Sequence, residues 1–294
     1  MSIVSGLING LSLGAIYALI ALGYTMVYGI ARMLNFAHGD IIMVGAYAIY
    51  LTLGISDNPV ISILGAIVFS IIICTLMGVT IEGLAYKPLR GASPLAVLIT
   101  AIGVSYFLQG IAQLIFGAKA LPITLPNLGS VRIFGTTVSV GTIITLIVGI
   151  ILMLALTLFV KYTRTGRAML AVSEDNGAAQ LMGVNVNRII MLTFAIGSAL
   201  AAFASLFYLL SIPSVDPKLG SMPGIKAFAA AVIGGIGSIP GAVFGGILLG
   251  LIESICKTVP GLGQYTLAIE FGILILMLLI RPIGILGKKR RVKV

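Results

Sequence analysis

Long apolar runs, separated by short polar segments, dominate the sequence. Asp, Glu, Lys and Arg are absent from residues 1–31, 95–118, 133–160, 189–215 and 227–252. A transmembrane helix needs about 20 apolar residues, whereas a membrane-spanning β-strand alternates apolar and polar residues over about ten positions. These runs are longer than a strand and do not alternate, so they predict an all-α polytopic membrane protein.

The runs predict a series of helices and one segment that is harder to assign. The helices are expected at 6–30, 37–53, 60–85, 95–116, 139–160, 189–212 and 264–281. The remaining apolar stretch, 225–255, has several glycines and Pro240 in its middle, which cost a helix interior up to about 1 and about 3 kcal/mol each. We expect either a broken or re-entrant pair of helices there, or a simple loop between two short spans. The total is then about eight or nine transmembrane helices.

Composition excludes a soluble globule, and the distribution of charge predicts an orientation. Charged residues make up 9% of the chain, against about 25% in soluble domains. The 18 Lys and Arg residues outnumber the 8 Asp and Glu residues, and many lie in 86–94, 161–188 and 282–294. We expect one membrane domain over 1–294. Since basic segments stay in the cytoplasm, its loop at 161–188 and its tail at 282–294 should be cytoplasmic, with the N-terminus outside. Bases scattered in this way do not indicate nucleic-acid binding, and the tail can contact anionic lipid.

The residue patterns that carry catalysis or metal binding are missing from the sequence. There is no G-x-x-x-x-G-K-[ST] motif for nucleotide phosphates, and the single histidine, His38, has no cluster of metal ligands near it. Cys74 and Cys256 indicate no disulfide framework. We therefore expect no catalytic residue, no metal site and no directly bound cofactor, so that any ATP and Mg²⁺ would be held by partner subunits.

Two ladders of small residues predict closely packed helices. Small residues at four-residue spacing let helix backbones approach closely in lipid. The ladders are Gly6, Gly10 and Gly14, and then Gly237, Gly241 and Gly245 alongside Ala242, Gly246 and Gly250.

The most polar internal segment, 161–188, predicts a short helix outside the membrane. Ser173 is a suitable N-cap, Glu174 and Asp175 suit the first turn, and Gly183 suits the end. The apolar side of this helix, at about 174–182, would consist of Ala178, Ala179, Leu181 and Met182. A helix of two turns is not stable alone, so it must pack on the protein's own helices or the headgroups, or on a cytoplasmic partner.

Motifs in this segment and elsewhere are shared with a known class of transporters. Gly177-Ala178-Ala179-x-x-x-Gly183 resembles the E-A-A-x-x-x-G loop of bacterial ABC-importer permeases, although Gly177 replaces the usual Glu and no I-x-L-P follows. The run from Thr165-Gly166-Arg167-Ala168 to Gly183-Val184-Asn185 resembles the variant found in branched-chain amino-acid permeases. Further similar motifs are Asn9-Gly10-Leu11, Ala15-Ile16-Tyr17-Ala18-Leu19, Gly23-Tyr24-Thr25-Met26-Val27-Tyr28-Gly29, Asn35-Phe36-Ala37-His38-Gly39-Asp40 and Gly234-Gly235-x-Gly237-Ser238-x-x-Gly241-Ala242. Together they resemble the LivH-type subunit of that family.

This resemblance implies a transport function and a set of partners. It implies a permease subunit, not an enzyme, that moves branched-chain or similar hydrophobic amino acids across a bacterial inner membrane. The implied partners are a second related permease, two cytoplasmic ATPase subunits and an extracytoplasmic substrate-binding protein. The implied ATPase-coupling residues are Glu174, Asp175, Ala178, Ala179 and Gly183. Two alternatives stay open: an ABC permease for urea, amides, sugars or nucleosides, and an ion-coupled secondary transporter.

Acidic residues within apolar sequence are candidates for the transport pathway. Glu82 precedes Lys87 by five residues and Glu253 precedes Lys257 by four, so local pairing is expected for both. Glu270 has no basic residue within ten positions on either side, so it either lines the pathway or pairs with another helix. A secondary transporter would use Glu270 or Glu253 as its coupling group.

The glycine-rich break in 225–255 is a further pathway candidate. Broken helices offer free backbone N–H and C=O groups to a substrate, so charged side chains are not needed there. The candidates are Gly234, Gly235, Gly237, Ser238 and Gly241, together with Glu270. His38, close to Asp40, is expected to be a hydrogen-bonded residue at a helix junction rather than a proton switch.

Overall fold

The computed structural model describes residues 3–55, 58–126, 128–133 and 136–287, and most of them are helical. The helices are α1 (Ile3–Ala31), α2 (His38–Thr52), α3 (Pro59–Ile81) with its extensions η1 (Glu82–Tyr86) and η2 (Lys87–Leu89), α4 (Pro94–Phe116), α5 (Val140–Tyr162), α6 (Arg164–Glu174), α7 (Asn176–Leu181), α8 (Val186–Ser211), α9 (Ser221–Gly234), α10 (Ile239–Thr258), η3 (Gly263–Tyr265) and α11 (Thr266–Ile280). Two short antiparallel strand pairs lie in the connections: β1 (Leu121–Pro122) with β4 (Ser214–Val215), and β2 (Ser130–Ile133) with β3 (Thr136–Ser139). The prediction of an all-α membrane protein is confirmed.

The sequence predicts about eight or nine transmembrane helices, and the described residues form seven long candidate spans and two shorter apolar helices. Among the described residues, seven helical segments are long and apolar enough to cross a membrane: α1, α3 with η1 and η2, α4, α5, α8, α10, and η3 with α11. The apolar helices α2 and α9 are shorter, at 15 and 14 residues. Polar side chains cap several of the long helices, since Asn58, Ser93, Ser139, Asn185 and Ser238 each accept a first-turn backbone N–H.

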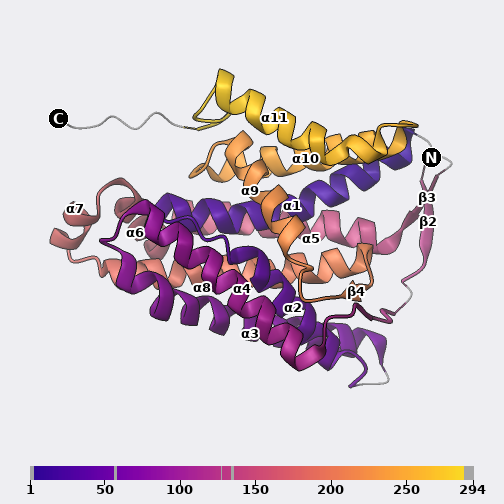
Figure 1. The fold of residues 1–294 in the computed structure, drawn as a ribbon, viewed down its shortest axis with the longest axis horizontal. Coiled ribbons are helices and arrows are strands. Elements are labelled where there is room, and N and C mark those ends of the chain that lie inside the picture. Colours follow the sequence, from indigo (N-terminus) through magenta and orange to yellow (C-terminus); the bar gives the residue numbers. More distant parts are fainter. Residues whose placement is uncertain (1–2, 56–57, 127, 134–135, 288–294) are drawn as a thin grey trace.

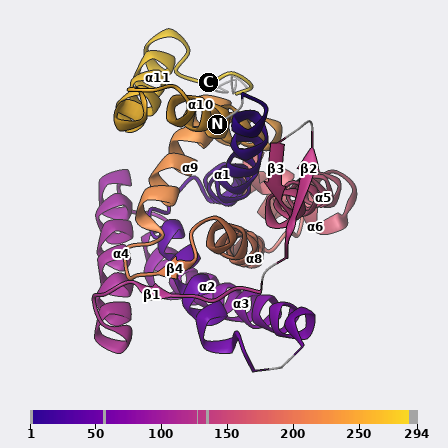
Figure 2. The same ribbon diagram turned by 90° about the vertical axis from the view of Figure 1, so that its right-hand side faces the viewer.

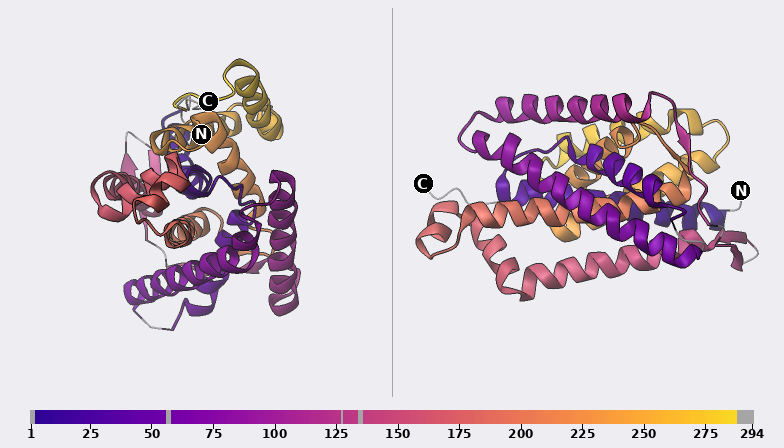
Figure 3. Two further views of the ribbon diagram at one scale, coloured as in Figure 1. Left: turned by 90° about the vertical axis from the view of Figure 1, so that its left-hand side faces the viewer. Right: turned by 90° about the horizontal axis from the view of Figure 1, so that it is seen from below.

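The long helices run between two ends of the molecule (Figures 1 and 3). We call one of them the basic end, because it carries Arg32, Lys87, Arg90, Lys161, Arg164, Arg167, Arg188 and Arg281. The opposite end holds the start of α1, the strand pairs and the α10–α11 connection. The start of α1 and the end of α11 therefore lie at opposite ends of the bundle.

Helix α1 forms the centre of the bundle, and α4 and α11 stand at its rim (Figure 2). In its most apolar window 72% of α1 is buried, whereas the figure is 22% for α4 and 11% for α11. A helix that is apolar all round and buried belongs to the core, while the exposed apolar faces of α4 and α11 suit lipid or another membrane protein.

Glycines from both predicted ladders form the contact between α1 and α10, while Gly241 and Gly245 pack on α9. A Cβ atom on Gly250 would lie 2.2 Å from the backbone N of Gly14, and one on Gly246 would lie 2.4 Å from the Cα of Ala18. Gly10 faces the same seam, where its Cβ would meet the backbone O of Gly250 at 3.2 Å. Side chains at these positions would force the two helices apart, so the ladders serve helix packing as expected.

The apolar stretch 225–255 is a helix pair with a sharp break. Gly235 ends α9 with φ of +110°, and Gly237 has φ of +90° before Ser238 caps α10 by accepting the N–H of Gly241 at 3.2 Å. Positive φ is readily available only to glycine, so the break needs these residues. The prediction of a broken pair is confirmed, although α10, at 20 residues, is longer than expected for a short span.

The two shorter apolar helices, α2 and α9, begin inside the bundle rather than at one of its ends. His38, the first residue of α2, packs against Gly23 in the second half of α1, where a Cβ would meet the His38 Nε2 at 2.2 Å. Gly220, which precedes α9, contacts Gly39 so closely that its Cβ would lie 1.9 Å from the Gly39 carbonyl oxygen. The N-termini of α2 and α9 therefore meet within the apolar part of the molecule.

Candidate functional site

The segment between α5 and α8 projects at the basic end and contains two helices (Figure 1). Thr163 caps α6 by accepting the N–H of Gly166 at 2.9 Å. Gly166 lies directly on the end of α5, because its Cβ would be 2.3 Å from the Phe159 carbonyl oxygen. Met169 and Val172 of α6 are fully buried. The segment is thus packed firmly onto the bundle.

The prediction of a single helix at 174–182 capped by Ser173 was wrong. Helix α6 continues to Glu174, and the Ser173 hydroxyl donates within it to the Leu170 carbonyl at 2.7 Å. Asp175 is the N-cap of α7 instead, and it accepts the N–H groups of Gly177 at 2.8 Å and Ala178 at 3.0 Å. Glu174 therefore ends one helix and does not lie in the first turn of the next.

Helix α7 exposes an apolar tip. Leu181 is 91% exposed and Met182 is 84% exposed, and Ala178 is also exposed. Ala179 is only 4% exposed and belongs to the core, so the predicted apolar side is divided between the two faces. Gly183, with φ of +83°, ends the helix as predicted.

A hollow of about 470 Å³ lies beside α7. Its lining is formed by Arg90, Asn176, Gly177, Gln180, Gly183, Val184, Asn185, Val186, Asn187 and Ile190. Arg90 bridges from here to Glu82 and to the Asn187 side chain. The expected pairing of Glu82 with Lys87 was wrong, because the π-helical turn η1 changes the spacing along this face and brings Arg90 to Glu82 instead.

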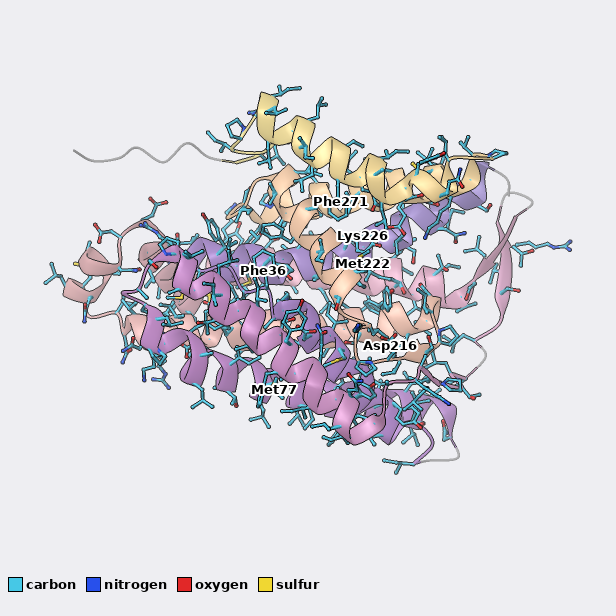
Figure 4. All side chains as sticks on the ribbon, in the orientation of Figure 1. Phe36, Met77, Asp216, Met222, Lys226 and Phe271 are labelled. Atoms are coloured by element: carbon cyan, nitrogen blue, oxygen red, sulfur yellow. The ribbon has the colours of Figure 1, made fainter. Side chains whose placement is uncertain are left out.

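An ion network joins four helices inside the membrane region. The Lys226 ammonium on α9 lies 2.7 Å from Glu253 Oε2 on α10 and 3.1 Å from Glu270 Oε2 on α11. Glu253 also accepts the Tyr17 hydroxyl of α1 at 2.6 Å and the ammonium of Lys257 at 2.7 Å. Figure 4 labels Lys226 on α9, between Met222 of the same helix and Phe271 of α11. The charges of the two lysines and two glutamates balance.

The network confirms two expectations and adds a residue that sequence reasoning missed. Glu253 pairs with Lys257 as predicted, and Glu270 pairs with another helix, which was one of its two predicted fates. Lys226 was missed because the stretch around it is otherwise apolar. The sequence did contain an indication of its role, since Lys226 is the single charged residue between Lys218 and Glu253.

A second polar group lies where α2 and α9 begin. Asp40, in the first turn of α2, is 2% exposed and accepts the Gln109 side-chain amide of α4 at 2.9 Å. The same amide nitrogen lies 3.2 Å from Ser105 Oγ and 3.3 Å from Ser221 Oγ of α9. Sequence reasoning named Asp40 only as the neighbour of His38, whose ring packs edge-on against Tyr24 at 4.9 Å.

The glycine break does not line an open site in the described structure. A Cβ on Gly234 would meet the Gly241 carbonyl oxygen at 1.8 Å, and the N–H groups of Ile285 and Leu286 bond to the carbonyls of Ile233 and Gly234 at 2.9 Å each. The free groups of the break are thus used by helix packing and by the segment after α11. Their predicted role in the pathway stays a prediction.

Comparison with known proteins gives matches over nearly the whole chain. A family model described as "Branched-chain amino acid transport system / permease component" matches residues 6–278. The high-affinity branched-chain amino acid transport system permease protein BraD of Pseudomonas aeruginosa is 45% identical over 298 residues, which cover 98% of this chain and 97% of BraD. The corresponding LivH protein of Escherichia coli K12 is 42% identical over 299 residues, which cover 97% of this chain and 96% of LivH. Among solved structures, PsaBC from Streptococcus pneumoniae in complex with Fab matches with a TM-score of 0.47 and 18% identity, covering 93% of this chain and 91% of that chain.

Proposed function

Because the chain belongs to the family of branched-chain amino acid transport system permease components, we propose that it carries branched-chain or similar aliphatic amino acids through the membrane. The observation that carries this proposal is the 45% identity to BraD over 98% of the chain. An apolar bundle with a few convergent polar groups inside it suits a small zwitterion with an aliphatic side chain.

The proposed assembly is an ABC importer in the bacterial cytoplasmic membrane. This chain would pair with a second related permease, two ATPase subunits that bind ATP and Mg²⁺, and an extracytoplasmic substrate-binding protein. The family supports these partners, and the absence of a P-loop motif from the sequence agrees with a nucleotide site on another subunit.

The basic end is proposed to face the cytoplasm, with α6 and α7 docked on an ATPase. Its charge supports this orientation, because Lys and Arg near membrane helices are retained on the cytoplasmic side. The exposed tip of α7 supports docking, since Leu181 and Met182 contact water in the isolated chain.

Labelling with an impermeant thiol reagent tests the orientation. A cysteine added after Val294 is expected to react only after the cells are permeabilised, whereas Lys119→Cys at the opposite end should react in intact spheroplasts. The native Cys74 and Cys256 are buried and provide the background. Labelling of the added C-terminal cysteine in intact spheroplasts would contradict the proposed topology.

Uptake by vesicles that contain the assembled transporter tests the function. With ATP inside and the binding protein outside, labelled leucine should accumulate even when ionophores collapse the proton and sodium gradients. Unlabelled isoleucine and valine should compete, and urea and fructose should not. Pairing of Glu253 and Glu270 with lysines supports this expectation, because neither carboxylate stands alone as an ion-coupling group. Uptake that stops with the gradients while ATP persists would favour a secondary transporter.

A further inference from the structure

The polar group around Asp40 joins three helices where α2 and α9 begin against α4. Its side chains are Asp40 of α2, Ser105 and Gln109 of α4, and Ser221 of α9. The Gln109 amide nitrogen has two hydrogens, and it lies within 3.3 Å of three oxygen acceptors in this group. Two hydrogens cannot bond fully to three oxygens, while the Ser105 and Ser221 hydroxyls can donate as well as accept.

Asp40 differs from the other membrane-embedded acids in its partners. Glu82, Glu253 and Glu270 each have a Lys or Arg nitrogen within 4.0 Å. Over the described residues, Asp40 has no such cation, and its partners are the neutral Gln109 and Ser105. A buried carboxylate without a cation is costly, and the N-terminus of its own helix offsets at most about 2 kcal/mol.

The helices that hold the polar group around Asp40 also carry exposed apolar side chains. Ser221 begins α9, and the next residue, Met222, is 47% exposed. Tyr106, next to Ser105 on α4, is 69% exposed, and Ile225, one turn after Ser221, is 43% exposed. The helices α4 and α9, which supply Gln109 and Ser221, thus also carry accessible apolar side chains.

We propose that Asp40 binds the α-ammonium group of the amino acid during its passage through the membrane, while Gln109 and Ser221 donate hydrogen bonds to the α-carboxylate. This inference rests on the proposed function. The ammonium group supplies the cation that Asp40 lacks, and Met222, Tyr106 and Ile225 offer contact to an aliphatic side chain. The Lys226 network is less suited to a zwitterion, because its two lysines and two glutamates already neutralise one another.

Asp40→Asn tests the site in the complete transporter, reconstituted in vesicles with its ATPases, second permease and binding protein. Asn keeps the shape and hydrogen bonding but removes the charge, so leucine uptake should fall at least about tenfold. ATP hydrolysis stimulated by the loaded binding protein should stay near that of the wild type. The matched control is Asp216→Asn, the same change in the segment before α9, which should keep its uptake.

Protection of an introduced cysteine gives a readout that a purely structural role would not change. In a Ser221→Cys transporter, millimolar leucine should slow labelling by a small thiol reagent, and this protection should disappear when Asp40→Asn is added. Should the Asn variant fail to assemble, Asp40→Glu retains the charge and should retain both assembly and protection.

The outcomes separate this inference from the proposed function. Wild-type vesicles that do not take up leucine would contradict the proposed function itself. Wild-type uptake combined with undiminished uptake by Asp40→Asn, or with protection that survives Asp40→Asn, would overturn the Asp40 site alone. Loss of assembly in both the Asn and Glu variants would also overturn it, since Asp40 would then be a structural residue.

Discussion

Replacing Lys226 with Met is expected to destabilise the folded permease by about 3–5 kcal/mol, because removal of one partner leaves buried charge uncompensated. Glu270 would lose the cation 3.1 Å from its carboxylate, and Glu253 would keep the Tyr17 hydroxyl and Lys257, whose side chain is 60% exposed. Thermal unfolding of the purified protein in detergent and its yield from membranes measure the effect. Lys218→Met, at an exposed position in the loop before α9, is the control and should change stability by less than about 0.5 kcal/mol.

A second substitution identifies the charge as the cause. Lys226→Met combined with Glu270→Gln removes the stranded carboxylate and should recover much of the lost stability, because a neutral amide is less costly to bury than an unpaired charge. Equal loss in the single and double variants would show that Lys226 acts through packing of its stem rather than through its charge.

The position of the network explains why α11 should respond first. Thr266 and Glu270 are the buried residues of α11, and the rest of the helix is partly or fully exposed. The ion pair between Lys226 and Glu270 is therefore the main polar link between α11 and the bundle. We expect Lys226→Met to loosen α11 before the α1–α10 seam, which is held by backbone contact at its glycines.

Features set by local sequence could be predicted, and those set by contacts between helices could not. Apolar runs define where helices cross, because each residue of a span must meet lipid or core. The ladder from Gly6 to Gly14 and the break after Gly234 were also visible, since small residues and glycine breakers act within one or two turns. By contrast, Lys226 lies 27 residues from Glu253 and 44 from Glu270, and no local pattern relates them.

The wrong prediction of the helix start at the basic end also arose from contacts between helices. Ser173 is an acceptable N-cap in isolation, but Met169 and Val172 pack on the bundle and carry α6 through it to Glu174. Because of this packing, α7 begins after Asp175, and Asp175 rather than Ser173 is its N-cap. The meeting of α2 and α9 inside the bundle was equally hidden, because it depends on contact between Gly39 and Gly220.

Exchanging both Leu181 and Met182 for Ser is expected to abolish transport without destabilising the permease. These side chains are 91% and 84% exposed, so the fold loses little when they change. If they are buried in an ATPase groove, each contributes about 1.5–3 kcal/mol to docking, and the pair decides whether the subunits stay together. Co-purification of the ATPases and ATP-driven leucine uptake measure the loss, and thermal unfolding of the permease alone should be unchanged.

Substitutions at two neighbouring positions of α7, Ala178 and Ala179, should distinguish an effect on docking from an effect on folding. Ala178→Arg places a bulky charge on the exposed side and should uncouple ATP hydrolysis from uptake, whereas Ala179→Arg forces a charge into a site that is 4% exposed and should impair folding. Glu174→Ala is the mild control, because removing an exposed charge near a helix end changes stability by only about 0.3–1 kcal/mol. Wild-type uptake by both Ala178→Arg and the Leu181 and Met182 double variant would exclude α7 as the docking element. The ATPase contact would then have to lie elsewhere at the basic end, with the hollow beside Arg90 as the next surface to test.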